Sequence, residues 1–180
     1  MLTLIDSHCH LDNEQFAGDH EAAIERARAA GVEHMVAIGS GDGPPDLEAG
    51  IRLADRYPFI YATIGVHPHD ASKATEETYA RLRELAAHPK VVAFGEMGLD
   101  YHYDLSPRAA QAQGFRTHID AARRTGLPLV IHSREAEDRT AQILEEEMAA
   151  GFLSTLLHCY TSGPALARRG LAIGAYVSFS

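Results

Sequence analysis

Short apolar stretches alternate along the chain with longer amphipathic stretches, and this pattern predicts short buried strands separated by helices. The short apolar stretches are rich in Val, Ile, Phe and Tyr, as buried strands are. We expect strands at Leu2–Asp6, Met35–Gly39, Ile60–Gly65, Val91–Gly95, Pro128–His132, Leu153–His158 and Ala175–Phe179. The stretches between them place glycine or proline where helices begin or end. We expect helices at Asp19–Ala30, Pro45–Tyr57, Thr75–His88, Ser106–Thr125, Glu135–Ala150 and Pro164–Leu171.

Strand and helix alternate with connections of a few residues, a pattern typical of the α/β class with parallel strands and crossover helices. Periodicity alone leaves two arrangements open, an open doubly wound sheet and a closed (β/α)8 barrel. The chain has 180 residues without a linker or a low-complexity tract, so we expect one domain over residues 1–180.

Composition narrows the class of protein. No apolar run approaches the roughly 20 residues of a membrane-spanning helix, so we expect no membrane contact. The first residues lack the basic stretch of a secretory signal, and two cysteines cannot make a disulfide scaffold; both features favour a cytoplasmic location. The 16 Lys and Arg against 25 Asp and Glu give a net charge of −9. This charge argues against a broad nucleic-acid surface but leaves room for a local phosphate site.

Histidine is unusually frequent, with 11 in the chain, and several histidines stand where predicted strands end. His8 and His10 lie two positions apart in an extended segment and therefore share a face. The carboxyl ends of parallel strands lie at one edge of the sheet, where α/β proteins bind ligands. The side chains that we expect to meet at this edge are His8, His10, Glu96, His132 and His158.

Imidazole nitrogens and a carboxylate gathered at one point are typical of a site for zinc, manganese or iron. Glu96 can bridge two ions roughly 3.5–4 Å apart, with the first histidine pair on one ion and His132 and His158 on the other. Two such ions lower the pKa of a bound water and neutralise charge on a phosphoryl oxygen. A single histidine at a strand end is more often a hydrogen-bonding group than a ligand. The gathering of five candidates at one edge favours the metal site.

Other polar residues are less decisive. His67 and His69 follow the third predicted strand, and two roles stay open for them: donors to a substrate phosphate, or caps of a loop. Cys9 and Cys159 adjoin candidate ligands but face away from them, which favours packing over ligation. The histidines that we expect to be solvated, on helices or turns, are His20, His34, His88, His102 and His118.

Five segments resemble, in order, the motifs of the TatD family of metal-dependent hydrolases. The segments are residues 5–12 (IDSHCHLD), 65–69 (GVHPH), 95–101 (GEMGLDY), 131–134 (IHSR) and 157–161 (LHCYT). They span essentially the whole chain, and the combination of the first and third segments is highly specific. The resemblance implies an amidohydrolase-like barrel and a metal-dependent deoxyribonuclease that trims DNA from the 3′ end.

The resemblance also implies a role for each matching residue. His8 and His10 match ligands of a first metal, Glu96 matches the bridging ligand, and His132 and His158 match ligands of a second metal. His67 is similar to a residue near the substrate phosphate. Arg134, just beyond a ligand, is a candidate phosphate contact, and a surface salt bridge is the alternative role.

One feature of the family is not found in this sequence. The family has a further ligand, an aspartate at the end of strand eight, whereas no aspartate follows Asp138 and the sequence ends at Ser180 within the seventh predicted strand. We therefore expect a barrel of about seven strands with the eighth missing. Either the chain is a fragment of a longer protein, or something else completes the fold.

The resulting expectation is a 3′-5′ DNA exonuclease with two divalent ions (Mg²⁺, Mn²⁺ or Zn²⁺), Glu96 in the catalytic centre and DNA ends as its partner. No obligate protein partner is implied. Two alternatives stay open: a related amidohydrolase-type enzyme that cleaves an amide, ester or lactone, and a catalytically inactive metal-binding fragment.

Overall fold

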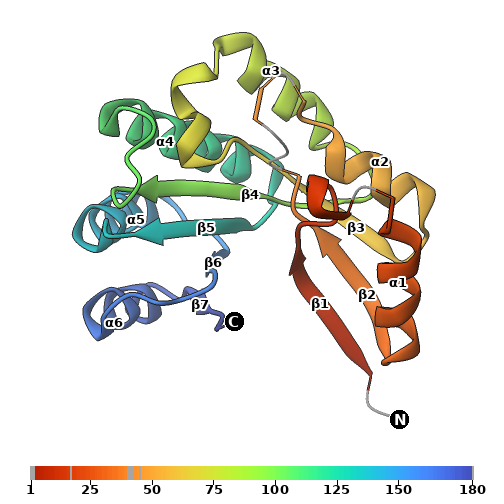
Figure 1. Cartoon of the computed structure of the whole chain (residues 1–180). Helices are drawn as coiled ribbons and strands as arrows, with labels where there is room; N and C mark the ends of the chain where they lie inside the picture. The colour runs from red at the N-terminus through yellow and green to blue at the C-terminus, as the bar shows by residue number, and fades with distance from the viewer. Residues whose placement is uncertain (1–2, 17, 40–42, 45, 180) are drawn as a thin grey trace.

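The structure of the chain is a computed structural model that describes residues 3–16, 18–39, 43–44 and 46–179. These residues form seven strands with helices between them (Figure 1). The strands are β1 (Leu4–Cys9), β2 (Val32–Ala37), β3 (Ile60–Ile64), β4 (Val91–Asp100), β5 (Leu129–Arg134), β6 (Thr155–Leu157) and β7 (Tyr176–Val177). The α-helices are α1 (His20–Ala29), α2 (Ala49–Arg56), α3 (Glu76–Leu85), α4 (Arg108–Thr125), α5 (Glu137–Ala150) and α6 (Pro164–Ala172). Two 3-10 turns, η1 (Glu14–Phe16) and η2 (Pro68–Lys73), follow β1 and β3.

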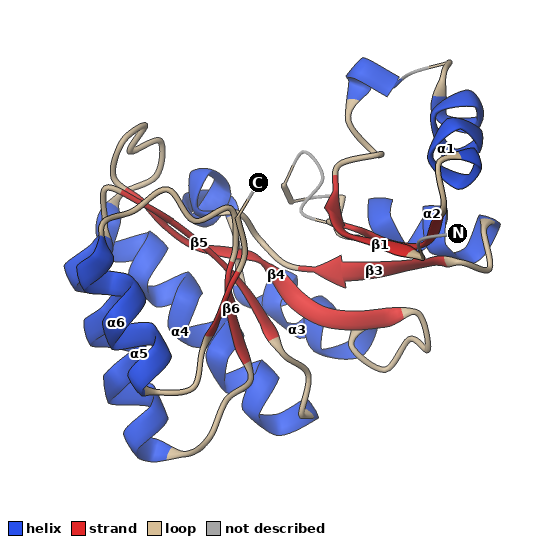
Figure 2. Cartoon of the chain, turned by 90° about the horizontal axis from the view of Figure 1, so that it is seen from below, coloured by secondary structure: helices blue, strands red, loops and turns tan. Residues whose placement is uncertain are grey.

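The strands form one sheet in the order β1-β2-β3-β4-β5-β6-β7, and every neighbouring pair is parallel. A doubly wound sheet reverses its strand order at a switch point, whereas this order follows the chain throughout, as in a barrel. Figures 1 and 2 show the sheet curling, with the helices on its outer side. The predicted α/β class is confirmed, and the arrangement is an incomplete (β/α)8 barrel of seven strands.

The core lies between the sheet and the helices. On α4, the residues Phe115, His118, Ile119 and Ala122 are buried, and their spacing of three and four positions gives the helix one face toward β4. Helix α4 ends at Thr125, as predicted, and the following Gly126 adopts the left-handed conformation with φ of 77°. This packing fixes the strand that carries the central carboxylate of the site.

The predicted exposure of His118 is wrong, because this side chain is 2% exposed. His118 lies on the core face of α4, where it accepts a hydrogen bond from the backbone N–H of Val66 (3.1 Å) and donates one to the carbonyl of Gly114 (2.7 Å). His20, His34, His88 and His102 are partly or fully exposed, as expected.

The element boundaries differ most at β4, which continues five residues beyond the predicted end at Gly95 and reaches Asp100. The predicted starts of the first strand at Leu2 and of the second helix at Pro45 lie outside the described residues. Within the described part of the chain, no helix is both long enough and apolar enough to span a membrane.

Candidate metal centre

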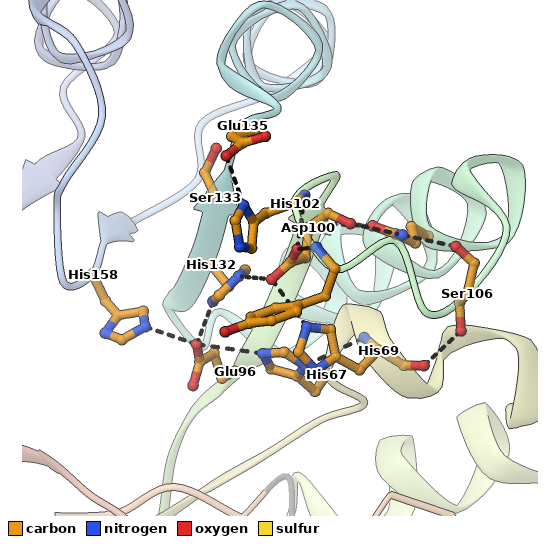
Figure 3. A network of polar contacts seen from close by, with 12 residues as sticks. His67, His69, Glu96, Asp100, His102, Ser106, His132, Ser133, Glu135 and His158 are labelled. Carbon is orange, nitrogen blue, oxygen red and sulfur yellow. Dashed lines mark hydrogen bonds and ion pairs between the residues drawn. The ribbon is translucent and has the colours of Figure 1, made fainter.

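The carboxyl ends of five strands bring one glutamate and five histidines together. His8 lies in β1 and His10 follows it, Glu96 lies in β4 and His132 in β5. His158 comes directly after β6, and His67 comes after β3. Figure 3 shows His67, His132 and His158 arranged around Glu96. The five side chains predicted to meet at this edge therefore do meet, and His67 joins them.

Glu96 is the centre of this cluster. Its side chain is buried, with a residue exposure of 4%. Oε2 lies 3.4 Å from Nε2 of His8 and 3.7 Å from Nε2 of His10. Oε1 lies 2.8 Å from Nδ1 of His132 and 2.7 Å from Nε2 of His158. The two carboxylate oxygens thus face two different pairs of histidines.

The histidines also contact one another. The Nε2 atoms of His8 and His10 lie 3.2 Å apart, so these two nitrogens and Oε2 of Glu96 converge on one point. The rings of His8 and His158 stack, with centroids 3.9 Å apart and an interplanar angle of 2°. Two groups of three side chains each bring their potential metal-ligand atoms within 4.8 Å of one another. The first group is His8, His10 and Glu96, and the second is His67, Glu96 and His132.

The donor set fits divalent metal ions. Imidazole nitrogens and a carboxylate suit zinc, and manganese accepts the carboxylate readily. Nδ1 of His8 is buried and has no hydrogen-bond partner among the described residues, so the surrounding protein does not fix which nitrogen carries the proton. The ring can therefore carry its proton on Nε2, where it faces Oε2 of Glu96, or move it to Nδ1 and leave the lone pair of Nε2 free for a metal ion.

Local backbone structure aims Glu96 into the site. The pairing of β4 with β5 shifts register between Phe94 and Met97, which places one extra residue in β4 next to Glu96. Gly95 lies within this bulge and Gly98 just beyond it, with φ of 144° and 140°. A Cβ atom on either glycine would overlap a backbone carbonyl oxygen of β5, that of Val130 or His132. The two glycines are therefore required for the close approach of the strands that carry Glu96 and His132.

The electrostatics keep Glu96 ionised. Burial alone raises the pKa of its carboxyl group, but hydrogen bonds from His132, His158 and His8 outweigh burial and hold the pKa well below its ordinary value. Burial lowers the pKa of His132, yet its contacts with Glu96 and Asp100 raise that pKa overall. The centre is thus an anion surrounded by imidazoles, which is an environment suited to cations.

Asp100 is a site residue that the sequence interpretation did not single out. Its Oδ2 lies 2.9 Å from Nε2 of His69 and 3.0 Å from Nε2 of His132. Its Oδ1 accepts hydrogen bonds from the backbone N–H groups of His102 (3.1 Å) and Tyr103 (2.9 Å). The available signal was its position four residues after Glu96, because alternate residues of a strand share a face.

His67 is held as a hydrogen-bond donor toward the centre. Its Nδ1 accepts a hydrogen bond from the backbone N–H of His69 (3.2 Å), so the proton of the neutral ring sits on Nε2. Nε2 lies 3.7 Å from Oε1 of Glu96. Burial lowers the pKa of His67 to about 4, so this ring is neutral at physiological pH.

Arg134, the other predicted substrate contact, lines a cavity of about 420 Å³ at the same edge of the sheet. The other lining residues are His10, Glu96, His132, Ser133, His158, Cys159 and Thr161. Its guanidinium lies over the ring of Tyr103, 4.9 Å from the centroid. No carboxylate within the described ranges forms an ion pair with Arg134, so the salt-bridge alternative lacks a partner there.

The cysteines differ in their surroundings. Cys9 packs against the core, its thiol donates a hydrogen bond to the carbonyl of Val36 (3.3 Å), and burial raises its pKa to about 12. Cys159 is exposed at the cavity wall. The high pKa disfavours the thiolate that metal ligation by Cys9 would need.

Known proteins resemble this chain over almost its full length. The model of the family described as "TatD related DNase" matches residues 5–180. The chain is 44% identical over 176 residues to the "Uncharacterized metal-dependent hydrolase YabD" of Bacillus subtilis (strain 168), covering 98% of this chain and 68% of that protein. It is 37% identical over 177 residues to the "3'-5' ssDNA/RNA exonuclease TatD" of Cronobacter turicensis, covering 98% of this chain and 66% of that protein.

A solved structure supports the same relationship. The crystal structure of YJJV, a TatD homologue from Escherichia coli k12, superposes with a TM-score of 0.84 at 30% sequence identity, covering 97% of this chain and 66% of that one. The chain thus spans about two thirds of the length of the relatives that it matches.

Proposed function

Because this chain belongs to the family of TatD-related DNases, a family with metal-dependent hydrolases among its members, we propose that it removes nucleotides from the 3′ ends of DNA with two divalent ions as cofactors. The relative from Cronobacter turicensis carries the name of a 3'-5' exonuclease on single-stranded DNA and RNA. For this chain the direction and the nucleic-acid substrate are part of the proposal.

The observation that carries the proposal is the division of the histidines by Glu96. One carboxylate oxygen faces His8 and His10, and the other faces His132 and His158. A carboxylate with separate donor pairs at its two oxygens has the arrangement that a bridging ligand needs. We therefore assign these five residues as the metal ligands.

Bound ions would supply Lewis acidity for a phosphoryl oxygen and a more acidic water for attack. The contribution of the chain is to hold the ligands in place. Asp100 contacts His132 through Nε2 while Glu96 contacts the same ring through Nδ1, so the two carboxylates fix the orientation of this ring.

The substrate contacts follow from charge and hydrogen bonding. Arg134 brings a positive charge to the cavity wall, and its guanidinium N–H groups can donate hydrogen bonds to a phosphodiester oxygen. His67 presents its Nε2–H toward the centre at neutral pH, which suits donation to a second phosphate oxygen. We assign both residues to phosphate binding.

The test is cleavage of a single-stranded oligodeoxynucleotide labelled at its 5′ end, with Mg²⁺, Mn²⁺ and Zn²⁺ supplied in turn. We expect a ladder of products shortened from the 3′ end, and its loss in Glu96→Gln. Glu25→Gln is the matched control, because Glu25 is an exposed glutamate of α1.

A parallel panel of esters, amides and lactones tests the alternative chemistry. Hydrolysis of a panel member without any cleavage of DNA would contradict the proposal in favour of an amidohydrolase-type enzyme. Ion binding without turnover of either substrate class would instead indicate an inactive metal-binding protein.

A further inference from the structure

An exposed tyrosine stands beside the cavity, in the loop that follows β4. Tyr103 is 54% exposed, although large aromatic side chains are usually buried. Its ring lies 5.5 Å from that of His69, and the Arg134 guanidinium lies over it. The ring therefore links the arginine at the cavity wall to the histidines around Asp100.

The backbone around this tyrosine is held firmly. Oδ1 of Asp100 accepts the N–H groups of His102 and Tyr103, and Nδ1 of His102 lies 2.7 Å from Oε1 of Glu135 in the loop after β5. Figure 3 shows the contact between His102 and Glu135 above Asp100. Asp104 and Glu135 both have φ of 51°, a left-handed conformation that L-residues rarely adopt. Non-glycine residues persist in this conformation where the surrounding structure imposes it, often at ligand sites.

We propose that Tyr103 and Arg134 form a stacking platform for the nucleobase at the 3′ end of a single-stranded nucleic acid. This proposal rests on the proposed function. A planar guanidinium above an aromatic ring offers two stacked π-surfaces, and bases stack on aromatic and guanidinium planes whatever their sequence. The same guanidinium carries the charge that the neighbouring phosphate needs.

The geometry favours a single strand over a duplex end. The cavity of about 420 Å³ has the size of a small-molecule pocket, which suits one nucleotide unit. A base can reach an aromatic platform only when it is unpaired and splayed from its neighbours. The platform would therefore select the terminal base rather than a particular sequence.

The experiment compares Tyr103→Ala with Tyr103→Phe, which keeps the ring. Two labelled single-stranded oligonucleotides serve as substrates, one with an ordinary 3′-terminal nucleotide and one with an abasic residue at that position. Phe152→Ala is the control, because Phe152 is 77% exposed and precedes β6, at the amino end of the strands. Binding is also measured, by fluorescence anisotropy without added metal.

For Tyr103→Ala we expect KM and Kd to rise about tenfold on the ordinary oligonucleotide, with a smaller change in kcat and little change on the abasic one. Tyr103→Phe and Phe152→Ala should match the unsubstituted protein on both. If Tyr103→Ala raised KM and Kd equally on both oligonucleotides, or raised them on neither, the proposed stacking platform would be overturned. If the unsubstituted protein cleaves neither oligonucleotide, the proposed function fails, and the anisotropy measurements alone decide whether the platform binds the base.

Discussion

His67, which is half-buried, and His118, which is fully buried, both have a pKa lowered to about 4, yet their side chains contact different partners. Nε2 of His67 faces the carboxylate of Glu96, whereas His118 lies in the core with both ring nitrogens engaged by backbone groups. The hydrogen bonds of His118 need one nitrogen as donor and the other as acceptor, which only the neutral ring provides. The neutral form of His118 is thus part of the folded structure.

This environment predicts a loss of stability in acid. Burial lowers the pKa of His118 from 6.5 to about 4. Between these two pH values His118 is therefore mostly protonated in the unfolded chain but mostly neutral in the folded chain. The contribution of neutral His118 is therefore complete above pH 6.5 and is lost as the pH falls to about 4. The full difference is about 3 kcal/mol.

The measurement is the free energy of unfolding in urea at several values of pH. As the pH falls from about 6.5 to about 4, the free energy of unfolding of the unsubstituted protein should drop by about 3 kcal/mol more than that of His118→Gln, which has no imidazole at position 118. The subtraction removes the other titrating groups, which both proteins share. An identical pH dependence in the two proteins would show that His118 takes up its proton without cost.

The residues at the strand ends could be found from the sequence, because polar side chains that interrupt apolar runs stand out. His118 and Asp100 could not be found so easily. His118 lies on the same helical face as Phe115 and Ile119, and this periodicity, rather than its residue type, was the available sign of burial. The role of Asp100 depends on the rings of His69 and His132, which come from other segments.

At the scale of elements, β4 determines the geometry of the centre. The apolar run predicts a strand that ends at Gly95, because the pattern becomes polar and glycine-rich there. The strand instead continues to Asp100, since its polar residues face the site and its glycines let β5 approach. Hydrophobic periodicity records burial in a core and therefore cannot follow a strand into a polar site.

Gly98 offers a test of this element. Alanine at position 98 would combine a left-handed φ of 140° with an overlap between Cβ and the carbonyl oxygen of His132. We expect Gly98→Ala to lower the free energy of unfolding by about 3 kcal/mol, as overpacked substitutions do, and to weaken metal binding by displacing β5.

The matched variant is Gly126→Ala. Gly126 also has a positive φ of 77°, but nothing lies within 4 Å of the point that its Cβ atom would occupy, so only backbone strain of about 1 kcal/mol is expected. Urea unfolding of both variants separates the two costs. Equal losses in the two variants would mean that the close approach of β4 and β5 does not require glycine.

At the scale of the whole molecule, the sequential strand order brings residues from β1 and from the end of β6 to one centre, although some 150 positions separate them in the chain. The alternation of strands and helices predicted a parallel sheet, but it left the barrel and the doubly wound sheet open. The motif order, through its family resemblance, favoured the barrel, and the observed strand order agrees with it.

The net charge of −9 limits how nucleic acid can bind. Among the described residues that line the cavity, Arg134 is the one arginine or lysine. If the protein contacts one or two phosphates of a single strand, a plot of log(1/Kd) against the logarithm of the salt concentration should have a slope of about −1. Anisotropy titrations of an oligonucleotide over a range of salt concentrations measure it, and a slope near −4 or steeper would indicate six or more phosphate contacts and contradict binding at an end.

The central claim is that Glu96 is shared between two ions, and calorimetric titration with Mn²⁺ or Zn²⁺ tests it most directly. We expect two ions per chain, with one binding step weakened in His10→Ala and the other in His158→Ala. Glu96→Gln should weaken both steps by at least about tenfold, because each carboxylate oxygen serves a different pair of histidines. A single ion per chain, or a loss of only one step in Glu96→Gln, would contradict the account.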